Sequence, residues 1–163
     1  MVQPSRNILS LWDHGWCDCN ELELPRSESW QEVVRAYLQD TSFQTSFVGP
    51  ELEHAELLHG PFWRAEVNPE DFRLLAVEEF YEDVQSIRQP PNFLEPVSDD
   101  QWRDVGDRLK MIQPNFEWLI KLRLTEIDTN KHHDWGFVLT IFREYLFANP
   151  NSAQVSRLTF GYD

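Results

Sequence analysis

The strongest constraint on the fold is a change of hydrophobic period in the last third of the chain. From Phe116 to Thr125 every even position is apolar, and Lys121 and Arg123 point to the opposite side. This period of two is typical of a β-strand with one buried and one solvated face. Two further alternating runs, Trp135–Phe147 and Val155–Tyr162, follow after polar segments. Consecutive strands joined by short turns usually pair as neighbours, so we predict a C-terminal three-stranded antiparallel meander.

Helix signals precede this region at three places. Residues 29–32 and 98–101 have the spacing of a capping box, and Asn68–Pro69 places a capping residue before a proline at the first helical position. The apolar spacing that follows predicts helices over 29–38, 68–87 and 98–112. Weaker strand patterns lie at Ile8–Trp12, Phe43–Val48 and Leu57–Val67. The predicted fold class is α+β, with N-terminal acidic helices packed on one face of a mainly antiparallel sheet that ends in the C-terminal three-stranded meander.

The length and charge of the chain predict one domain with two unlike halves. The 163 residues suit a single domain over 1–163, and 28 acidic against 14 basic residues give a net charge of −14. Residues 1–100 hold 20 acids and 6 bases, whereas residues 101–163 hold 8 of each. Three prolines lie between positions 90 and 96, and proline-rich connectors are stiff and extended. We predict a hinge at 89–97 between an acidic helical half and a neutral β half.

The composition excludes several partners and locations. Binding to nucleic acid needs clustered Lys and Arg, and a membrane-spanning helix needs about 20 consecutive apolar residues; the sequence has neither. Residues 1–16 combine one Arg, a short apolar stretch and Asp13, which is not the pattern of a secretory signal. Two cysteines without such a signal fit a reducing compartment. We therefore predict a cytoplasmic protein that binds neither nucleic acid nor membranes.

The motifs that would support catalysis or a bound metal are incomplete. His54 and His59 are five positions apart, whereas two histidines that bind one zinc ion from the same helix face are four apart. Cys17 and Cys19 are separated by one residue, which is tighter than the usual spacing of zinc ligands and would strain a disulfide. The histidines that would have to complete such a site are His14, His132 and His133. We favour buried, inert thiols, and we predict no metal, no cofactor and no catalytic residue.

A run of carboxylates after Pro69 is the strongest candidate for a binding surface. On a helix, the charges opposite the stripe of Phe72, Phe80 and Val84 would point to water. The alternative reading is a solvated helix face that only keeps the protein monomeric. The residues that we predict to contact a partner are Glu70, Glu78, Glu79, Glu82 and Asp83.

These observations favour a non-catalytic binding protein that offers an acidic face to a basic protein partner. Opposite electrostatic fields accelerate encounter, and carboxylates can replace phosphates in the groove of a nuclease. An immunity or inhibitor protein that neutralises a nuclease-type toxin is one form of this hypothesis. The alternative is a small α+β enzyme or ligand-binding domain with a pocket between the curved sheet and its helices. Its polar groups would be His14, Arg123, Arg143 or a buried carboxylate.

Overall fold

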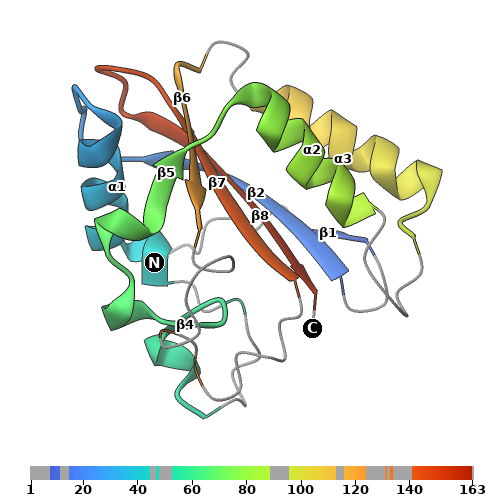
Figure 1. The fold of residues 1–163 in the computed structure, drawn as a ribbon, viewed down its shortest axis with the longest axis horizontal. Coiled ribbons are helices and arrows are strands. Elements are labelled where there is room, and N and C mark those ends of the chain that lie inside the picture. Colours follow the sequence, from blue (N-terminus) through green and yellow to red (C-terminus); the bar gives the residue numbers. More distant parts are fainter. Residues whose placement is uncertain are drawn as a thin grey trace.

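The computed structural model describes residues 8–11, 15–44, 47, 53–88, 96–112, 116–123, 131, 133 and 141–162. Within these residues the chain forms three α-helices, a six-stranded antiparallel sheet and a two-stranded hairpin (Figure 1), which confirms the α+β fold class. The helices are α1 (Trp30–Gln39), α2 (Val77–Arg88) and α3 (Asp99–Met111). The sheet contains β1 (Ile8–Ser10), β2 (Gly15–Glu23), β5 (Phe72–Leu74), β6 (Trp118–Leu122), β7 (Ile141–Ala148) and β8 (Gln154–Tyr162). The hairpin consists of β3 (Leu58–His59) and β4 (Phe62–Trp63).

The strands of the sheet follow the order β1-β2-β8-β7-β6-β5. The predicted meander is present, because β6, β7 and β8 are consecutive antiparallel neighbours. Its register places Ile120 of β6 opposite Leu146 of β7, which in turn lies opposite Arg157 of β8. Residues 124–130 and 134–140, which include the start of the second predicted strand, lie outside the described residues.

Helices cover both faces of the sheet, so the prediction of helices on one face and a solvated opposite face is wrong (Figure 1). Phe142 and Leu146 of β7 belong to the core under α1. Tyr145 and Phe147, which point the other way, belong to the core under α2 and α3. The prediction failed at Lys121, which occupies a polar position of the pattern but is only 2% exposed. Its ammonium group forms an ion pair with α2 instead of contacting water.

The helix predicted from Asn68 begins only at α2, because a short strand intervenes. Asn68 and Asp71 do form a capping box, but the box closes a single 3-10 turn at Pro69–Asp71. Strand β5 follows immediately and pairs with β6. The capping pattern therefore marks a real turn, while pairing with the edge of the sheet overrides the local preference for a longer helix.

The capping box predicted at the start of α3 is complete, and the one predicted at the start of α1 is present in part. The Gln101 N–H donates to Ser98 Oγ at 3.2 Å, and the Ser98 N–H donates to the Gln101 carboxamide oxygen at 3.3 Å. At α1, the Glu32 N–H donates to Ser29 Oγ at 3.3 Å, but the Glu32 carboxylate accepts from the N–H of Glu28, one residue before the cap. Both helices therefore begin where the sequence predicts.

The N-terminal strand predictions were correct in part. Ile8–Ser10 forms β1, whereas Trp12 lies outside the described residues. The strand predicted at Phe43–Val48 is wrong at its start, because Thr41–Gln44 is a 3-10 turn. The strand predicted over Leu57–Val67 is the short hairpin β3–β4 followed by another 3-10 turn. The nine-residue strand β2 was not predicted.

The two halves of the chain share one sheet. Strands β1, β2 and β5 come from residues 1–100, and β6, β7 and β8 come from the remainder. Most of the predicted hinge, residues 89–95, lies outside the described residues. Among the described residues, no helix has the length and apolar content needed to cross a membrane.

Candidate functional site

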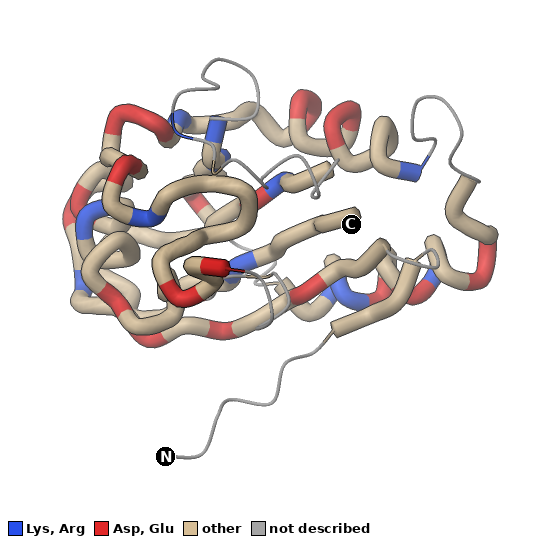
Figure 2. Tube along the Cα trace, turned by 90° about the horizontal axis from the view of Figure 1, so that it is seen from below, with Lys and Arg blue, Asp and Glu red and all other residues tan. Residues whose placement is uncertain are grey.

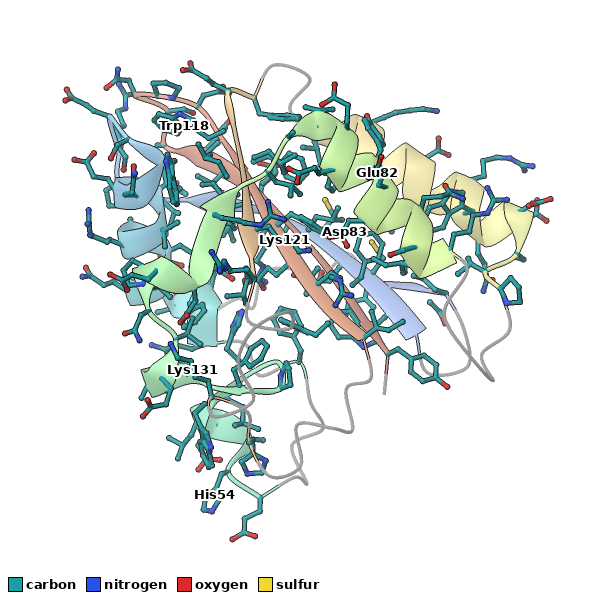
Figure 3. The ribbon with its side chains drawn as sticks, viewed as in Figure 1. His54, Glu82, Asp83, Trp118, Lys121 and Lys131 are labelled. Carbon is teal, nitrogen blue, oxygen red and sulfur yellow. The ribbon has the colours of Figure 1, made fainter. Side chains whose placement is uncertain are left out.

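The structure separates the five carboxylates that the sequence assigns to partner binding. Glu70 lies in the 3-10 turn before β5, and the other four lie on α2. Glu70, Glu78, Glu79 and Glu82 are exposed, whereas Asp83 is not. Figure 3 shows Glu82 on the outward side of α2 and Asp83 directed toward Lys121 of the sheet.

Asp83 joins α2 to the sheet. Its carboxylate lies 2.8 Å from Lys121 Nζ and 3.6 Å from Arg143 Nε, and it accepts a hydrogen bond from the Tyr145 hydroxyl. Burial alone would raise the pKa of the Asp83 carboxyl, but the hydrogen bonds from Lys121 and Tyr145 and the nearby positive charges hold that pKa below its ordinary value. The Asp83 carboxylate is therefore ionised at neutral pH, and its partners are groups of the sheet rather than another molecule.

Glu79 also has a local structural role. The Ala76 N–H donates to Glu79 Oε2 at 3.0 Å, which satisfies one free backbone group at the start of α2. The same carboxylate lies 3.6 Å from Arg73 Nη1 of β5. Glu78 and Glu82, by contrast, form no ion pair with any residue that the structure describes.

Exposed acids are not confined to α2. Figure 2 shows acidic positions on several sides of the chain trace, so the charge does not gather in one patch. The outward side of α2 differs because an aromatic ring lies among its carboxylates. Tyr81 is 61% exposed and is flanked in sequence by Glu82 and, one turn earlier, by Glu78. This combination of Glu78, Tyr81 and Glu82, which we call the α2 outer face, is the candidate partner-binding site.

An apolar groove adjoins the α2 outer face. It lies between α2 and α3, has a volume of about 520 Å³, and is lined mainly by apolar side chains. Phe80 and Tyr81 contribute from α2, Gly106 and Leu109 from α3, and Phe147 from β7. Of the described residues that line the groove, Lys110 alone carries a charge, and its ammonium lies 3.0 Å from Asp107. The groove therefore offers no acid–base pair for catalysis.

A second polar cluster, which the sequence analysis missed, lies under α1. His59 Nε2 is 3.0 Å from both carboxylate oxygens of Glu144, and the Tyr37 hydroxyl donates to the same carboxylate at 2.9 Å. Arg157 Nη1 donates to the Tyr37 oxygen at 3.3 Å, and the Thr159 hydroxyl donates to Glu144 at 3.3 Å. We call these five residues the buried polar cluster. The available signal was Glu144 itself, a charge at an inward position between Phe142 and Leu146.

The hydrogen bonds determine where the protons of the buried polar cluster lie. His59 Nδ1 is 2.8 Å from the Phe43 carbonyl oxygen, which can only accept, so Nδ1 carries a proton. Burial would raise the pKa of Glu144, but the positive charges of His59 and Arg157 and the Tyr37 hydrogen bond hold it below its ordinary value. Glu144 is therefore ionised, and the proton between it and His59 Nε2 belongs to the imidazole. Burial and the Glu144 charge raise the pKa of Tyr37 well above its ordinary value, so its hydroxyl remains a donor.

The buried polar cluster is closed to substrates. The side chains of His59 and Glu144 are both 0% exposed. The Phe43 ring stacks on His59 with centroids 4.1 Å apart, and Phe47 contacts the same imidazole edge-on at 5.5 Å. A cavity of about 340 Å³ is lined by Phe43 but not by His59 or Glu144. The geometry is that of a buried structural network rather than of an active site.

The described residues considered for a metal site do not form one cluster, although the rings of His54 and His133 have centroids 6.3 Å apart. Cys17 and Cys19 are free thiols that share one face of β2. His133 is buried against the Trp63 ring, with centroids 4.5 Å apart, and His54 is exposed. Among the described residues, no group of three or more His, Cys, Asp or Glu side chains is placed to hold a metal ion. His14 and His132 lie outside the described residues.

Of the groups that the sequence assigns to an enzyme pocket, Arg143 and the buried carboxylate have partners within the fold, and His14 lies outside the described residues. Arg143 lies beside Asp83, and the backbone N–H of Arg123 donates to the Asp71 carbonyl oxygen at 2.8 Å. The buried carboxylate exists as Glu144, but it belongs to the closed cluster under α1. Glu144 therefore lies on the opposite face of the sheet from the groove, whereas Arg143 lies on the α2 side, where it is beside Asp83.

Comparison with protein-family models, with curated proteins and with solved structures gives no match. The fold and the site must therefore be interpreted from their own geometry.

Proposed function

We propose that the protein is a non-catalytic binding domain that offers the α2 outer face to a basic protein partner. The observation that carries this proposal is the exposed Tyr81 ring between two carboxylates, Glu78 and Glu82, that no described cation neutralises. Tyrosine is enriched among the residues that dominate the energy of protein interfaces, and surrounding charges steer a partner of opposite sign. We place this activity in the cytoplasm, because Cys17 and Cys19 are free thiols and suit a reducing compartment.

An immunity or inhibitor protein that neutralises a nuclease-type toxin is the particular form of this function that we favour. A toxin of that kind binds phosphates through cationic side chains, and exposed carboxylates compete for the same groups. The alternative, an enzyme with its pocket under the helices, has less support. The groove has apolar walls and the His59–Glu144 pair is fully buried on the other face, while a second imidazole–carboxylate pair, His54–Glu53, is exposed to solvent.

The test begins with capture of a basic partner from the source cell and measurement of its association rate with the purified protein. The variant Glu78→Gln/Glu82→Gln removes two charges from the α2 outer face and leaves the structural carboxylates Glu79 and Asp83 in place. We expect slower association and a weaker dependence of the rate on salt, because rim charges act mainly on encounter. If the recovered partner is a nuclease, addition of the wild-type protein should inhibit it.

The matched control is Glu23→Gln/Glu56→Gln, which removes the same charge from two exposed positions on other elements. A thermal melt of each variant checks that the fold is retained. If both double variants slow association equally, the effect belongs to the net charge and the α2 outer face is not the site. If neither changes the rate at low or high salt, the acidic-face proposal is wrong.

A further inference from the structure

Gly106 is a feature of the α2–α3 groove that helix stability does not explain. It lies inside α3, where glycine is less favourable than alanine because it loses more backbone freedom on folding. A Cβ atom built at Gly106 meets nothing within 4 Å. At Gly161, in contrast, a Cβ atom would lie 2.1 Å from the Trp16 side chain, so packing requires that glycine. No neighbour among the described residues requires Gly106.

The effect of Gly106 is to leave its own position on the α3 wall of the groove free of side-chain atoms. The remaining wall and floor consist of large apolar groups, including Phe80, Leu109 and Phe147. At the mouth, Val77 is 42% exposed and Tyr81 is 61% exposed. A space of this size with an apolar lining can accept a large hydrophobic side chain from another molecule.

The charges around the groove indicate what kind of molecule would bind in it. The one cation that lines it, Lys110, is already paired with Asp107. Glu78 and Glu82, one helical turn apart on α2, have no ion pair with any described residue. The uncompensated charge beside the groove is therefore negative, and it complements a ligand that is both apolar and basic.

We infer that the groove receives an amphipathic basic helix of the partner, with one large apolar side chain seated beside Gly106 and Lys or Arg side chains against Glu78 and Glu82. This inference rests on the proposed function and adds the chemistry of the partner to it. A helix fits better than an extended segment, because a third helix packs naturally between two others and repeats its side chains at the one-turn spacing of the two carboxylates. The missing side chain at position 106 allows the two backbones to approach closely.

The experiment uses a defined probe, a fluorescent peptide of about 18 residues made of Leu and Lys with leucines at helical spacing, five turns long. A peptide of the same composition in scrambled order is the control. The dissociation constant of each peptide is measured by fluorescence anisotropy with the full chain at two salt concentrations. The protein variants are Gly106→Leu, Gly106→Ala and Glu78→Gln/Glu82→Gln, with Glu23→Gln/Glu56→Gln as the charge control.

We expect the ordered peptide to bind more tightly than the scrambled one. Gly106→Leu should weaken its binding about tenfold or more at both salt concentrations, because the new side chain occupies the space of the ligand's apolar group. The melting temperature of Gly106→Leu should stay equal or rise, since leucine is a better helix former than glycine. Gly106→Ala should raise the melting temperature in the same way and weaken binding less.

Three results would overturn the inference. Full-strength binding of the ordered peptide to Gly106→Leu would show that the groove is not used; a loss confined to Glu78→Gln/Glu82→Gln would then leave the acidic-face proposal standing. Equal binding of the ordered and scrambled peptides would show that the groove does not recognise an amphipathic helix. Absence of binding to wild-type protein would reject both the groove and this class of partner.

Discussion

At the scale of single residues, the buried polar cluster shows how the core tolerates charge. Glu144 is fully buried but its carboxylate accepts hydrogen bonds from Tyr37, His59 and Thr159, and the rings of Phe43 and Phe47 pack against the His59 imidazole. Removal of a buried charge is costly when it leaves its partners unpaired, whereas the intact pair adds little net stability. The positive charges of His59 and Arg157 therefore make Glu144 more sensitive to substitution than its size indicates.

Replacement of Glu144 tests whether the buried polar cluster is charged. Glu144→Gln keeps the shape but removes the buried negative charge that faces the Arg157 guanidinium, so we expect a loss of about 3–5 kcal/mol in the free energy of unfolding. Tyr37→Phe removes the hydrogen bond donated to Glu144 and the one accepted from Arg157, and should cost about 1–3 kcal/mol. Urea unfolding of both variants at neutral pH measures these losses, and a near-neutral Glu144→Gln would show that the cluster is not charged.

The pH dependence of the free energy of unfolding also follows from Glu144. The pKa of Glu144 in the folded protein is below its ordinary value, so its stabilising effect is present above the unfolded pKa of about 4.3 and is lost as the pH falls through the folded value. Wild-type stability should therefore decline below about pH 5, and Asp83 contributes in the same direction. Urea unfolding at pH 7 and pH 4 should give a smaller difference for Glu144→Gln than for the wild type. An equal difference would assign the acid sensitivity to other carboxyl groups.

At the scale of elements, α2 is attached to the sheet by the half-buried carboxylate of Asp83 and, at its exposed start, by the longer Glu79–Arg73 contact, and it presents other carboxylates to solvent. The sequence predicts the helix and its apolar stripe of Phe80, Val84 and Ile87, because they follow from spacing alone. It does not reveal that Asp83 faces inward, since that depends on Lys121 and Tyr145, which arrive from distant strands. The α1 and α3 caps were predictable because their partners lie within three or four residues.

The same distinction explains what else the sequence misses. Strand β5 is too short for periodicity to identify, and it exists because β6 offers it an unpaired edge. The groove depends on the side chains that α2, α3 and β7 bring together, and no local pattern encodes that arrangement. Gly106 was visible in the sequence, but its open surroundings were not.

Asp83→Asn and Glu82→Gln separate the two roles of α2. Asp83→Asn leaves the buried ammonium of Lys121 without its counter-charge, so we expect a clear fall in the melting temperature, corresponding to about 3–5 kcal/mol for a broken buried pair. Glu82 is exposed, and its substitution should change stability by no more than about 0.5 kcal/mol. Thermal melts of the two variants provide the comparison. Equal melting temperatures would mean that Asp83 does not hold α2 on the sheet.

At the scale of the whole molecule, helices on both faces enclose the central strands and the reactive side chains on them, including the cysteine thiols of β2. Cys17 is 1% exposed and packs in the core under α2 and α3. Burial raises the pKa of its thiol far above the ordinary value. Burial and the Glu21 carboxylate raise the pKa of the neighbouring Cys19 to about 11.

We therefore expect both thiols to react slowly with a disulfide reagent in the native protein. With a pKa of about 11, only about one thousandth of Cys19 is thiolate at pH 8, and reaction requires the thiolate. Cys17 should be labelled only as fast as the molecule opens, so its rate should rise in parallel with unfolding in urea. The single variants Cys17→Ser and Cys19→Ser show which thiol gives rise to each phase of the labelling reaction. Rapid labelling of Cys17 without urea would contradict its enclosure.

The short outer strands of the sheet have a consequence for the protein at high concentration. Strands β1 and β5 span three residues each, whereas β2 and β8 span nine. Beyond Asp18, the outer edge of β2 pairs with no described strand, and this edge carries Glu21 and Glu23. A second molecule that added its own β2 there would bring like charges together across the new ladder, which opposes strand addition. The sheet is thus a poor template for fibril growth, and salt that screens these carboxylates should weaken that protection.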